Sequence, residues 1–102
     1  GLLLVGCDPP EDLASLKVRN DTGEELSGLY LDGPEQTGNL LDAPLEDGGE
    51  RAVLEGDSGV VPGEYTWRVE YSLSLPGRAE GLSREPVRLW PGRNNLVLWV
   101  GL

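Results

Sequence analysis

The feature that most constrains the fold is the stretch of residues 64–75, in which apolar and polar side chains alternate without a break. Successive side chains of a β-strand point to opposite faces, so this pattern predicts a long strand with one buried face and one solvated face. A shift by one residue would expose the whole apolar set, and the register is therefore well specified. We expect this strand to form the centre of the core, with an apolar face made by Tyr65, Trp67, Val69, Tyr71, Leu73 and Leu75.

The remainder of residues 13–102 predicts further short strands around that centre. The 15 glycines and 8 prolines are dispersed between short apolar runs, and no run has the 3.6-residue period of a helix. This pattern is typical of a small all-β domain, an antiparallel β-sandwich of six to seven strands. The other strands are expected over residues 13–20, 26–31, 51–54, 82–90 and 94–100.

Several side chains outside the central strand are expected in the core. The inward positions of the flanking strands should carry Leu16, Val18, Val87 and Leu89, and the outward positions Lys17, Arg19, Arg84 and Arg88. The segment 32–50 is long for a loop in a compact domain, so we expect Leu40, Leu41 and Leu45 to attach it to the edge of the core. Turns are expected at residues 20–23 and at residues 90–93, where Pro91 and Gly92 fit a type II turn.

Composition excludes several classes of function. The net charge is −10, and residues 1–64 carry 15 acids against 3 bases, so a phosphate backbone would be repelled and nucleic acid is a poor partner. The chain has no histidine, which removes the Ser-His-Asp and Cys-His arrangements and histidine-ligated metals. We therefore expect no enzyme activity, no cofactor and no metal site.

The N-terminal residues 1–12 have a different character from the rest. The chain does not begin with Met, and its first residues are apolar, so we expect further sequence upstream. Leu4, Val5, Gly6 and Cys7 resemble the lipobox of bacterial lipoproteins, and Cys7 is the single cysteine of the chain. That resemblance implies a signal peptide ending at Gly6, and a diacylglycerol thioether on Cys7. The alternative is that residues 2–5 form a first strand and Cys7 is a buried thiol.

The segment that follows Cys7 favours the anchor. Residues 7–12 are acidic and contain Pro9 and Pro10, which is typical of an extended tether between a lipid anchor and a domain. Two or more acyl chains hold a protein stably on a membrane, so the resemblance implies a lipid-anchored protein of the bacterial cell envelope, facing the periplasm or the cell exterior. Asp8 directly after the cysteine is associated with inner-membrane retention in enteric-type bacteria.

The domain itself resembles small β-sandwich domains of secreted bacterial lipoproteins. The residues that carry this resemblance are Asn20, Thr22, Gly23, Leu29, Tyr30, Asn39, Leu40, Leu41 and residues 63–65. Residues 62–66 also resemble a turn of transthyretin-like and carboxypeptidase-regulatory-like sandwiches, and an Ig-like sandwich fits the pattern too. The resemblance implies fold and compartment, and it implies no catalytic residue.

The candidate sites are few. One candidate is a calcium site in the acidic loops, but these acids lack the spacing of a calcium-binding loop, and we favour solvated loop charge. The acids are Asp42, Glu46, Asp47 and Glu50, with Asp21, Glu24 and Glu25 nearby in the sequence.

In the last strand, Leu96, Leu98 and Val100 share one face, and Val97 and Trp99 share the other. With Trp90 they could form a binding surface for a protein or a sugar. The simpler interpretation, which we favour, is a last strand covered on both faces, or a bulge that turns Trp90 inward.

We therefore expect a membrane-anchored lipoprotein with a non-catalytic binding or structural module, and an envelope protein as its partner. The alternatives are a carbohydrate-binding module that uses Trp90 and Trp99, or a calcium-dependent adhesion module that uses residues 42–50.

Overall fold

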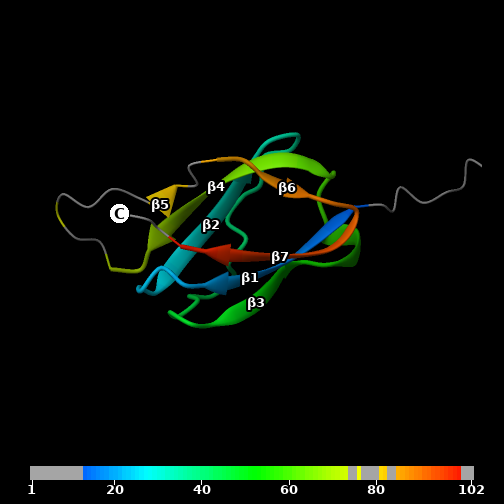
Figure 1. Ribbon diagram of the computed structural model, residues 1–102. Helices are drawn as coiled ribbons and strands as arrows, with labels where there is room; N and C mark the ends of the chain where they lie inside the picture. The colour runs from blue at the N-terminus through cyan, green and yellow to red at the C-terminus, as the bar shows by residue number, and fades with distance from the viewer. Residues whose placement is uncertain (1–12, 74–75, 77–80, 83–84, 100–102) are drawn as a thin grey trace, which may run out of the picture.

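The computed structural model describes residues 13–73, 76, 81–82 and 85–99, and these residues form two β-sheets packed face to face (Figure 1). The predicted all-β sandwich is confirmed. One short 3-10 turn, η2 (Gly56–Ser58), interrupts the strands. The strands are β1 (Ala14–Asn20), β2 (Leu26–Asp32), β3 (Glu50–Leu54), β4 (Gly63–Tyr71), β5 (Gly81–Leu82), β6 (Val87–Leu89) and β7 (Gly92–Leu98).

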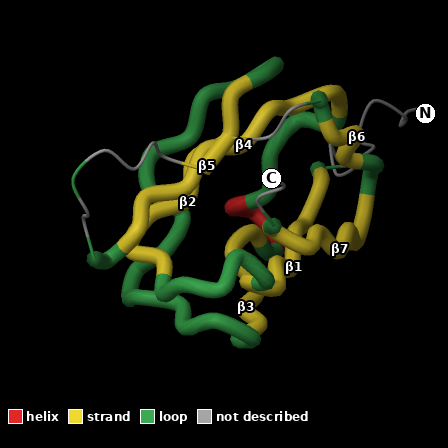
Figure 2. Tube along the Cα trace, turned by 60° about the vertical axis from the view of Figure 1, so that its left-hand side comes forward, coloured by secondary structure: helices red, strands yellow, loops and turns green. Residues whose placement is uncertain are grey.

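One sheet has the order β3-β1-β7, and in the other β4 lies between β2 on one edge and β5 and β6 on the opposite edge (Figure 2). Every pair is antiparallel except β1 and β7, which run parallel from Ala14 opposite Gly92 to Asn20 opposite Leu98. The chain leaves β6 in one sheet and enters the other beside the start of β1, so β7 must run in the same direction as β1.

The central strand is confirmed as β4, and its faces are as predicted. Tyr65, Trp67 and Val69 are buried, whereas Thr66 is exposed. The strand ends earlier than expected, because its pairing with β2 ends where Tyr71 faces Leu26. Leu73 lies beyond this pairing and is 61% exposed, so its predicted place in the core is wrong. The predicted core residue Leu75 lies outside the described residues.

The core combines side chains from both sheets and from the long connection between β2 and β3. Leu16 and Val18 face inward as predicted, and Leu41 and Leu45 are buried while Leu40 is partly buried against them. The connection also covers the outer edge of β2. There Thr37 and Asn39 accept hydrogen bonds from the amides of Leu31 (2.9 Å) and Leu29 (3.1 Å), which satisfies edge groups that would otherwise need water or a partner.

Asn20 closes the end of β1 as a fully buried polar side chain. Its amide nitrogen donates to the carbonyls of Glu24 (2.7 Å) and Leu45 (2.9 Å). Its side-chain oxygen accepts from the amide (3.0 Å) and the hydroxyl (2.7 Å) of Thr22. The turn predicted at residues 20–23 is thus fastened to the long connection, and Gly23 takes the positive φ (+89°) that the turn requires.

The last third of the chain differs in detail from the prediction. The single strand expected over residues 82–90 is present as two short strands, β5 and β6. In β6, Leu89 is buried, Val87 is partly buried and Arg88 is exposed. Arg84 and Val100 lie outside the described residues. The turn before β7 has Gly92 at φ +91°, as the third position of a type II turn demands.

Candidate functional site

The three side chains predicted as a binding surface are all exposed: Trp90 by 61%, Val97 by 46% and Trp99 by 59%. On β7, Leu98 is buried and Leu96 is partly buried against the core, so strand alternation places Val97 and Trp99 on the outer face. The favoured interpretation, with the last strand covered on both faces or Trp90 turned inward, is therefore wrong. No described segment covers this face of β7, which is the last strand of its sheet.

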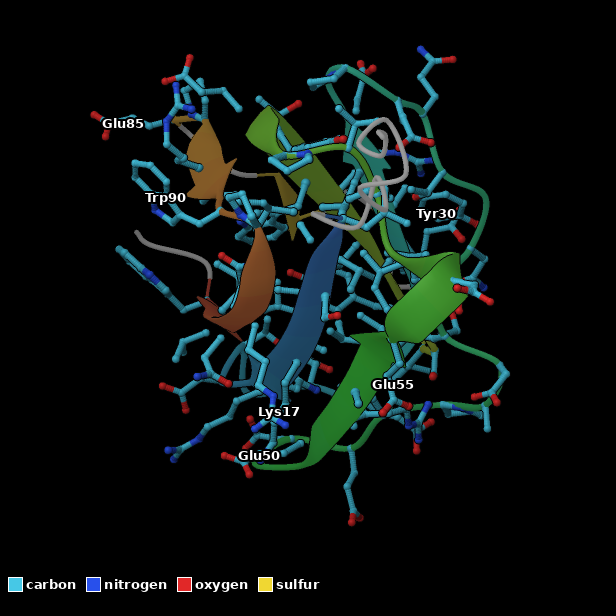
Figure 3. The ribbon with its side chains drawn as sticks, turned by 90° about the vertical axis from the view of Figure 1, so that its right-hand side faces the viewer. Lys17, Tyr30, Glu50, Glu55, Glu85 and Trp90 are labelled. Carbon is cyan, nitrogen blue, oxygen red and sulfur yellow. The ribbon has the colours of Figure 1, made fainter. Side chains whose placement is uncertain are left out.

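The structure does not bring the two tryptophans together. Trp90 precedes β7 and Trp99 follows it, and the seven residues of the strand separate them by roughly 20 Å at the usual rise of a β-strand. Val97 and Trp99 are next-but-one neighbours on the same face and do form a local apolar surface. Trp90 points away from the sandwich beside the end of β6 (Figure 3).

Asn94 fixes the turn that carries Trp90. Its side-chain oxygen accepts a hydrogen bond from the amide of Trp90 (2.9 Å), and its side-chain nitrogen donates to the carbonyls of Trp90 (2.8 Å) and Ser15 (3.0 Å). The indole itself is contacted by Arg88, whose guanidinium carbon lies 5.3 Å from the ring centroid and whose Nη2 lies 3.6 Å from a carboxylate oxygen of Glu64. The turn is rigidly attached to β1, while the ring stays accessible.

The outer face of the sheet β3-β1-β7 is basic, although the chain as a whole is strongly acidic. Parallel pairing sets Arg93 beside Ser15 and Arg19 beside Val97. Lys17 lies between them on β1 and makes a 3.3 Å salt bridge with Glu50 of β3 (Figure 3). Arg19 and Arg93 are exposed and have no salt-bridge partner among the described residues, unlike Lys17, Arg51, Arg68 and Arg88.

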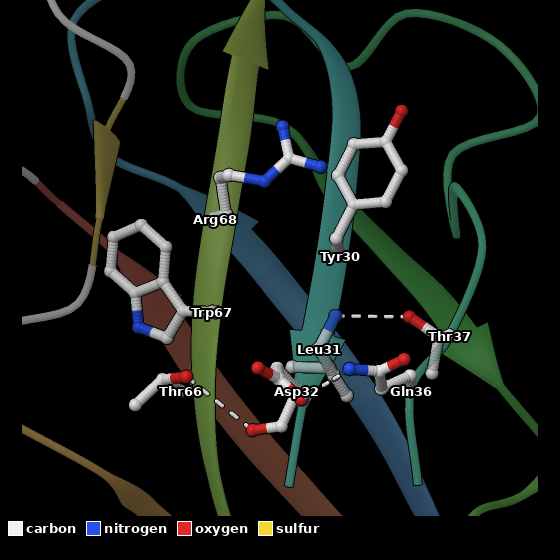
Figure 4. Close-up of a pocket in the computed structure, with 8 residues that line it drawn as sticks. All are labelled: Tyr30, Leu31, Asp32, Gln36, Thr37, Thr66, Trp67 and Arg68. Atoms are coloured by element: carbon white, nitrogen blue, oxygen red, sulfur yellow. Dashed lines mark hydrogen bonds between the residues drawn. The ribbon is translucent and has the colours of Figure 1, made fainter.

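A hollow of about 520 Å³ lies on the outer face of β2 and β4 (Figure 4). The strand pairing places Tyr30 opposite Arg68, and the guanidinium carbon lies 4.1 Å from the ring centroid. Glu70 accepts a hydrogen bond from the Tyr30 hydroxyl (2.8 Å) and lies 3.5 Å from Arg68. The hollow is open. Of its two charged side chains, Arg68 pairs with Glu70, and Asp32 accepts a hydrogen bond from Gln36 (3.2 Å). The residues that line it are Tyr30, Leu31, Asp32, Gln36, Thr37, Thr66, Trp67 and Arg68.

Sequence reasoning missed this hollow. The available signal was that Tyr30 and Arg68 occupy the solvated positions of two alternating strands. Which strands pair, and in which register, cannot be derived from alternation alone.

Three of the acids weighed as calcium ligands make contacts with other parts of the domain. Asp42 lies 3.6 Å from Arg51, Asp47 accepts from the amide of Gly23 (2.9 Å), and Glu50 pairs with Lys17. In the part of the chain that the structure describes, no three acids, cysteines or histidines lie close enough together to hold a metal ion.

Tyr65 is a titratable group whose pKa is shifted by its surroundings. Its ring is fully buried, and its hydroxyl donates to the carbonyl of Val61 at 2.5 Å. Burial, and secondly the nearby charge of Glu35, raise the pKa of Tyr65 above its ordinary value of 10.0. Because the group lies within the core and bonds to the backbone, we assign it to stability.

Cys7 and the whole predicted tether lie outside the described residues. Within the described ranges, no helix is long and apolar enough to cross a membrane. Comparison with known protein families, curated proteins and solved structures finds no match to this chain.

Proposed function

We propose that this chain is a lipid-anchored, non-catalytic binding module of a bacterial cell envelope, which contacts an envelope protein through the outer face of β7. The observation that carries the binding role is the exposure of Val97 and Trp99 on that face. Large apolar side chains that stay accessible on a folded domain often mark the site of a partner, and tryptophan is enriched among residues that dominate binding energy.

The anchor rests on the lipobox resemblance of residues 4–7 and on the acidic, proline-containing tether that follows Cys7. A thioether-linked diacylglycerol at Cys7 would place the domain close to the membrane surface. The net charge of −10 then keeps the body of the domain away from anionic lipid heads and leaves its faces accessible.

The anchor is tested by expressing the precursor, with its upstream sequence, in a bacterium fed labelled palmitate. We expect the label on the wild-type protein and its partition into the detergent phase. The variant Cys7→Ser should be unlabelled and soluble. Membrane partition that persists in Cys7→Ser would contradict the lipid anchor.

The binding face is tested in the same cells with a photo-crosslinking amino acid in place of Trp99. The matched control carries it in place of Glu55, which is exposed just after β3, at the edge of the sheet opposite β7 (Figure 3). We expect a cross-linked species of discrete mass from position 99 and none from position 55. Equal cross-linking from both positions would show that the face of β7 has no special role.

Carbohydrate binding is the second candidate, because two indole rings are exposed at the ends of β7. Their separation rules out a single sugar ring stacked on both, so a glycan would have to extend along the strand. Titration with cell-wall oligosaccharides while the tryptophan fluorescence is followed distinguishes this candidate from a protein partner.

A further inference from the structure

β7 is the longest strand with an open edge in the described structure. β2 is bordered on its outer side by residues 36–41, and β4 by β5 and β6. β3 also has an open edge but is only five residues long. β7 extends over seven residues, and β1 is the only strand paired with it among the described residues.

The hydrogen bonds at the two ends of β7 show which of its backbone groups face outward. The amide of Gly92 donates to the carbonyl of Leu13 (3.1 Å), and the carbonyl of Leu98 accepts from the amide of Asp21 (2.8 Å). In a parallel ladder, every second residue of a strand directs both its N–H and its C=O to the same neighbour. The even-numbered residues therefore bond to β1, and the amides and carbonyls of the odd-numbered Arg93, Asn95 and Val97 point to the open edge.

The side chains of β7 suit an added strand with one polar and one apolar face. On the outer face, an added strand would lie beside Arg93 and Val97, with Arg19 on the next strand. On the inner face it would lie beside Leu96, which packs on the core but is only partly buried. Apolar side chains on that face of the added strand would cover Leu96.

The charges identify the chemistry of the added strand. Arg19 and Arg93 are the two described bases without a salt-bridge partner, and both lie on the outer face of this sheet. Carboxylates placed along the outer face of an added strand would pair with them. A second copy of this chain is disfavoured, because each copy has a net charge of −10 and self-pairing would bring together two basic faces.

We infer that β7 binds an extended, acidic segment of a partner protein, which joins the sheet β3-β1-β7 as a fourth strand beside β7. This inference rests on the proposed function, since it names the partner chemistry and the binding mode of the same face. Backbone hydrogen bonds supply the contact, and glutamate or aspartate at alternate positions supplies the selectivity. Such a segment would run the length of the strand and contact both Trp90 and Trp99.

The test uses the 102-residue chain under reducing conditions and a labelled seven-residue peptide in which glutamate alternates with valine. We expect saturable binding by fluorescence anisotropy that weakens as salt is added. Two control peptides should fail to bind. One has lysine in place of glutamate, and the other has the same side chains but N-methylated amides, which cannot donate to the strand edge.

Two variants of the protein separate the contribution of the backbone amide to peptide binding from that of the side chain at position 97. Val97→Pro removes an amide that points to the open edge, and it leaves the hydrogen bonds to β1 in place. An edge strand tolerates proline at such a position. Binding should weaken about tenfold or more, as expected when a backbone hydrogen bond is lost and the approach of the added strand is blocked. Val97→Thr keeps the amide and exchanges one methyl group for a hydroxyl, so it should weaken binding clearly less than Val97→Pro does, since the backbone bonds remain. The thermal melt of both variants should stay close to that of wild type.

Equal affinity for the N-methylated peptide, or for Val97→Pro, would overturn strand addition. Equal affinity for the lysine peptide would overturn the acidic partner. A stable dimer that Val97→Pro dissociates, with no peptide binding, would assign the edge to a second copy instead. Failure of the Cys7 labelling experiment would defeat the proposed anchor and leave these peptide results unaffected, so the two failures can be told apart.

Discussion

Replacing Asn20 by alanine should remove a large part of the stability of this domain. The side chain is fully buried and makes four hydrogen bonds, two to backbone carbonyls and two from Thr22. The bond to the carbonyl of Leu45 is buried, whereas the other three are partly buried and can be replaced by water. With about 1 kcal/mol for each replaceable bond and 1–3 kcal/mol for the orphaned carbonyl, the loss is about 4–6 kcal/mol.

A domain of this size has about 5–15 kcal/mol of unfolding free energy, so Asn20→Ala should be marginally folded. Urea denaturation followed by tryptophan fluorescence measures the loss, provided that the dependence on urea concentration is unchanged. The control Thr22→Val keeps the bonds that Asn20 donates and removes the Thr22 hydroxyl, whose single proton is within reach of both Asn20 (2.7 Å) and the carbonyl of Glu24 (3.1 Å). It should cost about 1 kcal/mol.

Asn20→Asp tests the direction of these bonds. A carboxylate would face the carbonyl oxygens of Glu24 and Leu45, so the folded state should favour its protonated form and raise its pKa. Stability should then be highest below the ordinary carboxyl pKa of about 3.9 and fall as the pH rises above it.

A loss below about 1 kcal/mol for Asn20→Ala would show that water substitutes for the amide, and would refute the reasoning.

The remaining predictions concern three aromatic side chains. Trp67→Ala should cost about 3–5 kcal/mol in urea denaturation, because the indole is only 6% exposed, and a loss below about 1 kcal/mol would contradict its place in the core. Trp99→Ser should leave the melting temperature nearly unchanged and abolish cross-linking to the partner from a probe at Val97, whereas a large thermal shift would place the indole in the core. Tyr65 should resist ionisation above pH 10.0, and because its folded pKa is raised, stability is fully present below that pH and is lost as the pH rises through the folded value. Tyr65→Phe should lessen this alkaline sensitivity and cost about 1 kcal/mol near neutral pH, through the lost bond to Val61, as alkaline and urea denaturation would measure.

The sequence predicts most of the strands of this domain, because alternation reports directly which side chains face the core. Tyr65, Trp67 and Val69 in β4 and Leu16 and Val18 in β1 follow that rule. Leu73 does not, because its burial depends on whether another strand runs beside it, and the pairing of β2 ends two residues earlier.

The candidate site could be predicted only in part. The pattern places Val97 and Trp99 on one face, but whether that face is covered depends on the order of strands in the sheet. The basic surface formed by Arg19 and Arg93 depends on the parallel pairing of β1 with β7, and no local signal in the chain reveals it. The hollow between Tyr30 and Arg68 depends in the same way on the register of β2 against β4.

The pairing of β1 with β7 also sets the order in which this domain can be assembled. β1 is the central strand of its sheet, and its partner β7 begins 78 residues later, at Gly92 opposite Ala14. The sheet therefore cannot be completed until residues 92–98 are available, and contacts between such distant segments form slowly. A chain cut before Gly92 would leave one edge of β1 unpaired and exposed to other chains.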